Sequence, residues 1–234
     1  DRRTAESARS TYPVEIREPG LAVEAGIAIE EGLWYLHKTM NRSGNDDGDW
    51  RGNCGAACDA DGLVSAANLT AFQRVGFRDS ASDANPYTDT TRRALRTLLE
   101  RGGDEALRTA DWVEALATVN DPARVAETGP AGIRGETLGQ IVAQFRKEDG
   151  ATTARAASVA ALSMAGAREL IDLQTAEGYW KAAGSDAPFA TARAIRALAE
   201  TFRAAGASTI FNISSQVSVT TSGFLFSRVT RTFN

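Results

Sequence analysis

Two stretches of the chain follow the same plan, and this repetition constrains the fold more than any other feature. Each stretch has a long apolar helix pattern, a polar turn that closes on Gly-x-Trp, and an Ala-rich helix pattern that ends before a glycine. The two turns are DDGDW, residues 46–50, and EGYW, residues 177–180. One helix–turn–helix unit cannot cover its own apolar face, so the repetition predicts that neighbouring units stack and bury a continuous core.

The Gly-x-Trp turns are interpreted as structural joints between helices. Helix ends leave backbone amides and carbonyls without partners. Gln174 can hydrogen-bond such groups across to the next helix, and Trp180 can pack on the helix stems while its indole N–H reaches a carbonyl. Gly178 permits the tight backbone of the turn. Gly48 and Trp50 are assigned the same structural role, so none of these five residues is expected to take part in chemistry.

The second copy resembles the repeat known as the QW motif of the terpenoid cyclase and protein prenyltransferase superfamily. Leu173 and Gln174 precede Gly178 and Trp180 as they do in that motif, and the resemblance extends over residues 21–205. It implies an α/α toroid, which is a ring of inner and outer helices.

The first copy departs from the motif. Met40 stands where the Gln is expected, and the turn that leads to Gly48 and Trp50 is longer. The domain is therefore predicted to be all-α, a partial α/α toroid of about seven helices. The helix patterns cover residues 22–40, 63–76, 85–102, 104–119, 134–147, 152–175 and 188–204.

The two ends of the chain do not share the helical pattern. Residues 1–20 are charged, contain two prolines and show no periodicity, which predicts an irregular tail. Residues 206–234 are rich in Val, Thr, Ser and Phe, and polar residues alternate there with apolar ones, which is typical of strands. Ser222 and Gly223 are predicted to form a turn. This segment resembles the opening strands of Ig-like β-sandwich modules of exported bacterial proteins, so it is predicted to begin a truncated β-sandwich.

The catalytic residues of the superfamily that this chain resembles are not found in its sequence. Squalene-type cyclases protonate an alkene with Asp-x-Asp-Asp, and the nearest string here, residues 45–49, lies in the first Gly-x-Trp turn. Protein prenyltransferases bind zinc through Asp, Cys and His, and His37 is the only histidine of the chain. His37 is interpreted as a packed or hydrogen-bonded residue of the first helix. We expect a non-catalytic, secreted or cell-surface helical-repeat scaffold or binding domain. The alternative is an incomplete or degenerate terpene cyclase or prenyltransferase-like enzyme.

Two cysteines and a group of aspartates lie around the first joint. Cys54 and Cys58 favour a disulfide that pins a glycine-rich loop, with two free thiols or a metal site as alternatives. Five aspartates are weak candidates for calcium ligands, namely Asp46, Asp47, Asp49, Asp59 and Asp61. An EF-hand is excluded, because Ala57 and Asn68 stand at the positions of its two key carboxylates. A solvated polar loop is the default interpretation, and no cofactor is expected.

Charge and hydropathy narrow the classes of partner. A net charge of −4 and a pI near 5.2 provide no basic field for nucleic acid. No apolar run approaches the ~18 residues that a membrane span requires. The arginines of the third helix pattern, Arg92, Arg93 and Arg96, are expected to pair with carboxylates in solvent. A protein or a glycan is therefore the expected kind of partner.

Overall fold

The computed structural model describes residues 20–44, 47–50, 61–79, 85–102, 110–148, 164–181 and 187–204. Within these ranges the chain is helical and has no strand beyond an isolated bridge, so the all-α class is confirmed for the described part. The predicted tail (apart from Gly20) and the predicted β segment at residues 206–234 lie outside the described residues.

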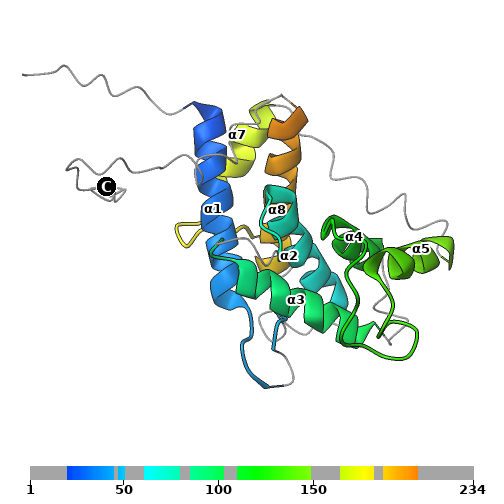
Figure 1. Cartoon of the computed structure of the whole chain (residues 1–234). Helices are drawn as coiled ribbons and strands as arrows, with labels where there is room; N and C mark the ends of the chain where they lie inside the picture. Colours follow the sequence, from blue (N-terminus) through cyan, green and yellow to red (C-terminus); the bar gives the residue numbers. More distant parts are fainter. Residues whose placement is uncertain are drawn as a thin grey trace, which may run out of the picture.

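Figure 1 labels the helices of the described ranges. They are α1 (Leu21–Thr39), α2 (Asp61–Val75), α3 (Thr88–Arg101), α4 (Ala110–Thr118), α5 (Leu138–Glu148), α7 (Met164–Asp172) and α8 (Ala187–Ala204). Each of them falls within, or within about two residues of, a range in which the apolar spacing predicts a helix.

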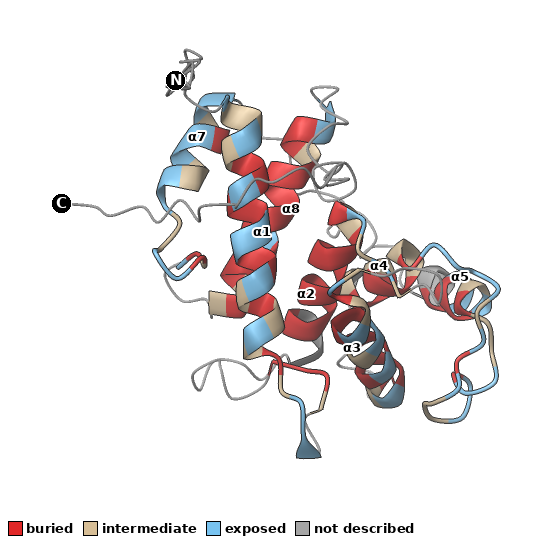
Figure 2. Ribbon diagram, turned by 60° about the vertical axis from the view of Figure 1, so that its left-hand side comes forward, coloured by how far each residue is buried: buried red, intermediate tan, exposed pale blue. Residues whose placement is uncertain are grey.

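Helix α2 lies at the centre of the bundle. Helices α1, α3, α4 and α8 all contact it. Every residue from 64 to 73 is buried, which is typical of a helix that is enclosed on all sides. In Figure 2 the turns of α2 have the colour of buried residues, whereas those of α7 are mostly exposed.

The helices form an inner group, which includes α2, and a flanking group. The inner group is α8, α2 and α4, and α2 packs against both of the others. Of the flanking helices, α1 contacts α2 and α8, α3 contacts α2, and α7 contacts α1 and α8. Helix α5 packs on α4. Consecutive helices thus alternate between the flanking and the inner group from α1 to α4, and again from α7 to α8.

Helix α7 runs in the same direction as α1, and the ends of α2 and α8 lie together. Arg168 of α7 pairs with Glu24 of α1, and farther along both segments Gln174 bonds the carbonyl of Ala28. In the inner group, Arg74 near the end of α2 pairs with Glu114 of α4 and with Glu200 near the end of α8. The shared direction of α7 and α1 is what stacked helix–turn–helix units produce.

The buried stripe of α1 excludes two residues that the sequence places among its apolar residues. Ile27 is 52% exposed and Trp34 is 51% exposed. The buried residues of α1 that face the core are Ala25, Gly26, Ala28, Ile29, Gly32, Leu33 and Leu36. Positions 27 and 34 lie seven residues apart on the opposite side of the helix, so α1 has apolar side chains on both sides.

Helix α5 begins four residues later than its apolar pattern predicts. Thr137 forms an isolated antiparallel bridge with Val125, which holds the preceding chain in an extended conformation. The Thr137 hydroxyl then accepts a hydrogen bond from the Gln140 amide, and the Gln140 side chain accepts one from the Thr137 amide. This reciprocal pair is a capping box and fixes the start of the helix at Leu138.

None of the helices in the described ranges is both long enough and apolar enough to cross a bilayer.

Candidate functional site

The second joint, residues 174–180, fastens the end of α7 to α1 and α8. The buried indole of Trp180 donates to the carbonyl of Leu170 at 2.7 Å, and its backbone amide donates to the Thr191 hydroxyl of α8 at 3.1 Å. The side-chain amide of Gln174 donates to the carbonyl of Ala28 at 2.9 Å and to that of Gly178 at 3.0 Å. One neutral side chain therefore closes its own turn and ties that turn to the neighbouring helix.

The first joint, residues 40–50, has the same backbone closure around a longer loop. The amide of Asn41 donates to Asp49 O and the amide of Gly48 donates to Asn41 O, both at 2.8 Å. In the second joint the same two bonds run from Thr175 to Tyr179 O and from Gly178 to Thr175 O. The Trp50 indole donates to the carbonyl of Leu36 at 2.8 Å, as Trp180 does to that of Leu170. The additional residues lengthen the loop and leave its base unchanged.

The glycine of each joint lies against the backbone of a flanking helix. Gly48 has a φ of 91° and Gly178 a φ of 85°. A Cβ atom would lie 2.5 Å from the Arg93 carbonyl oxygen at Gly48 and 2.9 Å from the Glu31 carbonyl oxygen at Gly178. Both the backbone conformation and the available space therefore require glycine. The first joint docks on α3 in this way, and the second docks on α1.

A third tryptophan makes the same contact, although the sequence analysis placed it in a helix without a joint. The Trp112 indole of α4 donates to the carbonyl of Leu98 in α3 at 3.0 Å. Leu98 and Trp112 are 14 residues apart, as are Leu36 and Trp50. The search for Gly-x-Trp missed this joint, because alanine stands two residues before Trp112. The signals that this joint shares with the first joint are the leucine-to-tryptophan spacing and the Asp-Trp pair.

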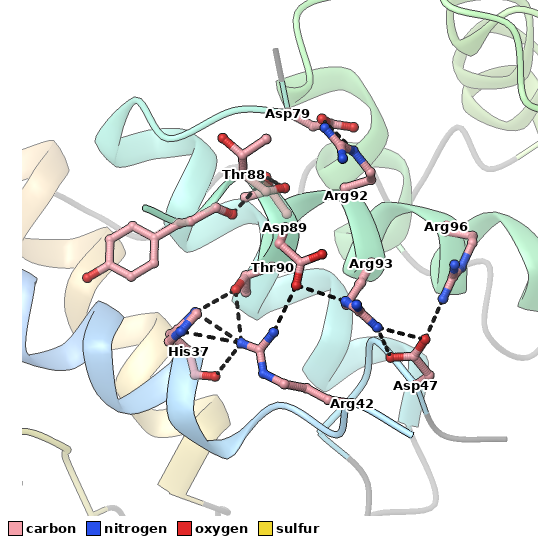
Figure 3. Close-up of polar contacts among 12 residues, drawn as sticks. His37, Arg42, Asp47, Asp79, Thr88, Asp89, Thr90, Arg92, Arg93 and Arg96 are labelled. Carbon is pink, nitrogen blue, oxygen red and sulfur yellow. Dashed lines mark hydrogen bonds and ion pairs between the residues drawn. The ribbon is translucent and has the colours of Figure 1, made fainter. Parts of the chain in front are cut away.

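Ion pairs link the first joint to α3, and Figure 3 shows them in close-up. Asp47 accepts hydrogen bonds from Arg93 at 2.8 Å and from Arg96 at 2.6 Å. Its backbone carbonyl accepts one from the Thr97 hydroxyl at 2.6 Å. Burial acts to raise the pKa of Asp47, but the two guanidinium groups outweigh it and hold the pKa below its usual value. Arg92 pairs with Asp79, so the expectation that these arginines pair with carboxylates is confirmed.

Asp49 is a buried carboxylate at the base of the first joint. Its side chain is fully buried, and one oxygen accepts a hydrogen bond from the Asn41 side chain at 2.8 Å. The other oxygen lies 2.6 Å from the guanidinium of Arg101, the last residue of α3. A buried carboxylate needs such a partner because leaving it unpaired is costly. This pair thus holds the end of α3 next to the first joint.

His37, near the end of α1, contacts the start of α3 (Figure 3). Its Nδ1 is 2.7 Å from the Thr90 hydroxyl and 3.0 Å from the Arg42 guanidinium, which in turn bonds Asp89 at 2.9 Å. A guanidinium can only donate, so Nδ1 accepts and the proton of the neutral ring is on Nε2. Burial and then the charge of Arg42 lower the pKa of His37, against the opposing effect of Asp89. The ring also stacks on Trp34, and the interpretation of His37 as packed and hydrogen-bonded is confirmed.

A second group of ion pairs joins the three inner helices. Arg196 of α8 is 6% exposed, and its guanidinium lies 3.1 and 3.0 Å from the two carboxylate oxygens of Glu114 in α4. Glu114 also pairs with Arg74 of α2 at 2.8 Å. Arg196 lies 3.4 Å from Asp111, whose pKa is raised by burial despite this positive neighbour. Sequence reasoning missed Arg196, because an arginine in an Ala-rich helix pattern resembles a solvent-facing one.

The candidate metal and disulfide residues are only partly described. Cys54, Cys58, Asp46 and Asp59 lie outside the described residues, as does the side chain of Asp61 at the start of α2. The carboxylates of Asp47 and Asp49 are both engaged by arginines. Among the described residues, no group of three or more His, Cys, Asp or Glu side chains has the geometry to hold a metal ion.

Comparison with known proteins found no matching protein family, no similar curated protein and no similar solved structure.

Proposed function

We propose that this chain is a non-catalytic helical-repeat scaffold, arranged as part of an α/α toroid, that presents a binding face to a protein or glycan partner. The observation that carries the proposal is the packing between the inner helices. In a cyclase of the resembling family this is where a pocket would be needed, and here side chains of α2, α4 and α8 meet. Residues 64–73 of α2 are all buried, and Arg196 of α8 pairs with Glu114 of α4.

The toroid arrangement draws support from the three tryptophan contacts. Each one caps the carbonyl of a leucine near the end of a flanking helix, namely Leu36, Leu98 or Leu170. Two of the joints also dock on the next flanking helix, so that α7, α1 and α3 follow one another in space. Repeated docking of this kind generates a curved array of helix pairs.

The alternative, an incomplete or degenerate terpene cyclase or prenyltransferase-like enzyme, draws support from the joints alone. Of the polar residues that such chemistry would recruit, two in the described part of the chain, His37 and Asp47, are engaged elsewhere. The Nδ1 of His37 accepts hydrogen bonds, and both oxygens of Asp47 accept hydrogen bonds from arginines. A catalytic base or a metal ligand needs an available lone pair next to its substrate.

A ligand and activity assay separates the two functions. The purified chain is incubated with a linear polyprenyl diphosphate, with and without Zn²⁺, and separately with squalene, and both the Tm and the products are measured. The scaffold function predicts no product and no rise in Tm. A ligand-dependent rise in Tm accompanied by turnover would establish the enzyme instead. A ligand that binds the native state but not the unfolded state raises the Tm. The absence of a shift therefore argues against binding of these ligands.

We also propose that the domain is secreted or displayed on a cell surface. Support comes from the sequence alone, through the strand pattern of residues 206–234 and the spacing of Cys54 and Cys58. Thiol titration and peptide mass mapping of protein purified without reductant are the tests. A Cys54–Cys58 disulfide agrees with an oxidising compartment, whereas two reactive thiols argue against it.

A further inference from the structure

The outer side of α1 carries exposed apolar side chains in a line. Val23, Ile27 and Trp34 are 43%, 52% and 51% exposed, and their spacing of four and seven residues places them on one side of the helix. Leu173, which directly follows the neighbouring helix α7, is 67% exposed. Figure 2 shows exposed turns of α1 and α7 near each other, and the Arg168–Glu24 ion pair joins the two helices.

The same surface has an excess of negative charge. Its exposed acidic residues are Glu30, Glu31, Glu169, Asp172 and Glu177, and its exposed basic residues are Lys38, Arg168 and Lys181. Glu30 is already hydrogen-bonded to the Tyr87 side chain, and Arg168 is already paired with the half-buried Glu24, which leaves four carboxylates and two cations on this surface. Helix α3 differs, because its arginines bond the carboxylates around them. We call the surface formed by α1, α7 and the turn after α7 the acidic face.

Trp34 is held in a fixed orientation on the acidic face. Its ring stacks on His37 with the ring centroids 5.2 Å apart, and the Lys38 ammonium lies 5.8 Å from the centroid of the indole. His37 is in turn fixed by Thr90 and Arg42. A tryptophan that is exposed yet already ordered loses little entropy when a partner covers it, which is typical of residues that dominate binding energy.

We propose that the acidic face binds a basic amphipathic helix of a partner protein. Apolar side chains at three- and four-residue steps on that helix would contact Ile27 and Trp34, and its Lys and Arg side chains would meet Glu31 and the acidic residues of α7. The excess of negative charge favours a positively charged partner, and the line of apolar side chains along α1 favours a helical one. The proposal rests on the scaffold function and deepens it by naming the surface and the chemistry of the partner.

The test uses a fluorescently labelled synthetic peptide of about 18 residues, about five helical turns, with Leu on one side and Lys on the other. A control peptide has the same composition, with its Leu residues spread around the helix. Fluorescence anisotropy is measured with the whole chain at low and physiological salt. We expect the amphipathic peptide to bind more tightly, and equal binding of the two peptides would overturn the proposal.

Variants locate the binding surface. Trp34→Ala and Ile27→Ser are each expected to weaken binding by about tenfold, the range of a hot-spot residue. Glu31→Lys is expected to weaken it mainly at low salt. Val125→Ser removes an equally exposed apolar side chain from the loop before α5 and is the matched control. Binding that survives both Trp34→Ala and Ile27→Ser with unchanged affinity would overturn the proposal.

Two further outcomes have defined meanings. Concentration-dependent dimerisation that Trp34→Ala abolishes would show that a second copy of the chain occupies the face, and would overturn the proposal of a basic helix. Failure of the peptide to bind, together with no ligand shift in the assay with polyprenyl diphosphate, would reject the acidic face and leave the scaffold function standing. Turnover in that assay would reject the scaffold function itself.

Discussion

The two Gly-x-Trp joints share a backbone and differ in what fastens it to the next helix. In the second joint, the neutral amide of Gln174 bridges the turn and α1. In the first joint, Met40 occupies the corresponding position, four residues after the capped leucine, and the fastening is ionic. Asp47 bonds Arg93 and Arg96 of α3, and Asp49 pairs with Arg101. The glycine and tryptophan are therefore common to these two joints, whereas the side chains that fasten them differ in kind.

Removal of a tryptophan should have the largest effect and should be similar in all three joints. We expect Trp180→Ala and Trp50→Ala each to lower the free energy of unfolding by about 3–5 kcal/mol, because a large buried ring and its hydrogen bond to a helix carbonyl are lost. Trp112→Ala is expected to fall in the same range if its joint is equivalent. Urea denaturation followed by circular dichroism measures the loss, with Trp34→Ala as the exposed control. A loss near zero for Trp180→Ala would contradict the joint assignment.

The glycines test whether both joints press against a flanking helix. Gly48→Ala and Gly178→Ala combine an unfavourable φ with a clash against backbone, so each should cost about 2–4 kcal/mol. Gly76 is the matched control, since its φ of 109° is also positive but a Cβ atom there would meet nothing within 4 Å. We expect Gly76→Ala to cost only about 1 kcal/mol, from the backbone conformation alone. Equal losses of unfolding free energy at the three positions, measured from denaturant midpoints, would show that the joints do not press against the flanking helices.

An exchange of the fastening residues sharpens the comparison. Gln174→Leu should cost about 1–2 kcal/mol, because two hydrogen bonds to backbone carbonyls are lost. The reverse change, Met40→Gln, should also cost about 1–3 kcal/mol, because it places an amide in the hydrophobic core at a position that is only 4% exposed. A Met40→Gln variant that is more stable than the parent in thermal melts would show that both joints can use the family's glutamine.

Salt should affect the two joints differently. Asp47→Asn removes a partly exposed carboxylate from Arg93 and Arg96, and we expect a loss of about 1 kcal/mol or less. This loss should shrink as the salt concentration rises from 0.05 to about 0.5 M, since screening weakens exposed ion pairs. The loss from Gln174→Leu should stay constant over the same range. Identical salt dependence of the two variants would mean that the ionic fastening of the first joint is unimportant.

Acid should weaken the contact between α1 and α3 through His37, although the effect is expected to be the smallest. The pKa of His37 is lowered in the folded state, so the unfolded state binds the proton more readily. The stabilisation is therefore fully present above the ordinary histidine pKa and is lost as the pH falls toward the lower pKa of the folded state. His37→Gln should flatten this part of the stability–pH curve in urea titrations between about pH 7 and pH 5. An unchanged slope in the variant would assign the pH dependence to other groups.

The sequence predicted the helices better than the contacts between them. Apolar periodicity located every described helix, and the start of α5 failed only because the Val125–Thr137 bridge extends the preceding chain. The exposure of Trp34 could not be predicted, since a tryptophan in an apolar helix is usually buried and α1 has apolar residues on both sides. The roles of Arg196 and Arg101 depend on carboxylates 82 and 52 positions away in the chain, which no local pattern reveals.

The third joint lacks the Gly-x-Trp pattern that identifies the other two. Gly-x-Trp identified two joints because both require a glycine with positive φ beside a neighbouring helix. Ala110 and Trp112 both lie within α4, where the backbone does not need a glycine two residues before the tryptophan. The contact to Leu98 O is preserved because it needs only the indole N–H and a leucine carbonyl near the end of the flanking helix, at a separation of 14 residues in two joints and of 10 in the second. The conserved element of this chain's repeat is thus the hydrogen bond rather than the glycine.

The central claim is that three tryptophans cap leucine carbonyls and one does not. Hydrogen exchange of the four indole N–H groups, followed by ¹H–¹⁵N NMR of the whole chain, tests it most directly. The account predicts three slowly exchanging indole signals, from Trp50, Trp112 and Trp180, and one rapidly exchanging signal, from Trp34. Assignment follows from the loss of one signal in each single Trp→Phe variant. Rapid exchange at two or more of the three joint tryptophans, under conditions in which the core amides stay protected, would contradict the account.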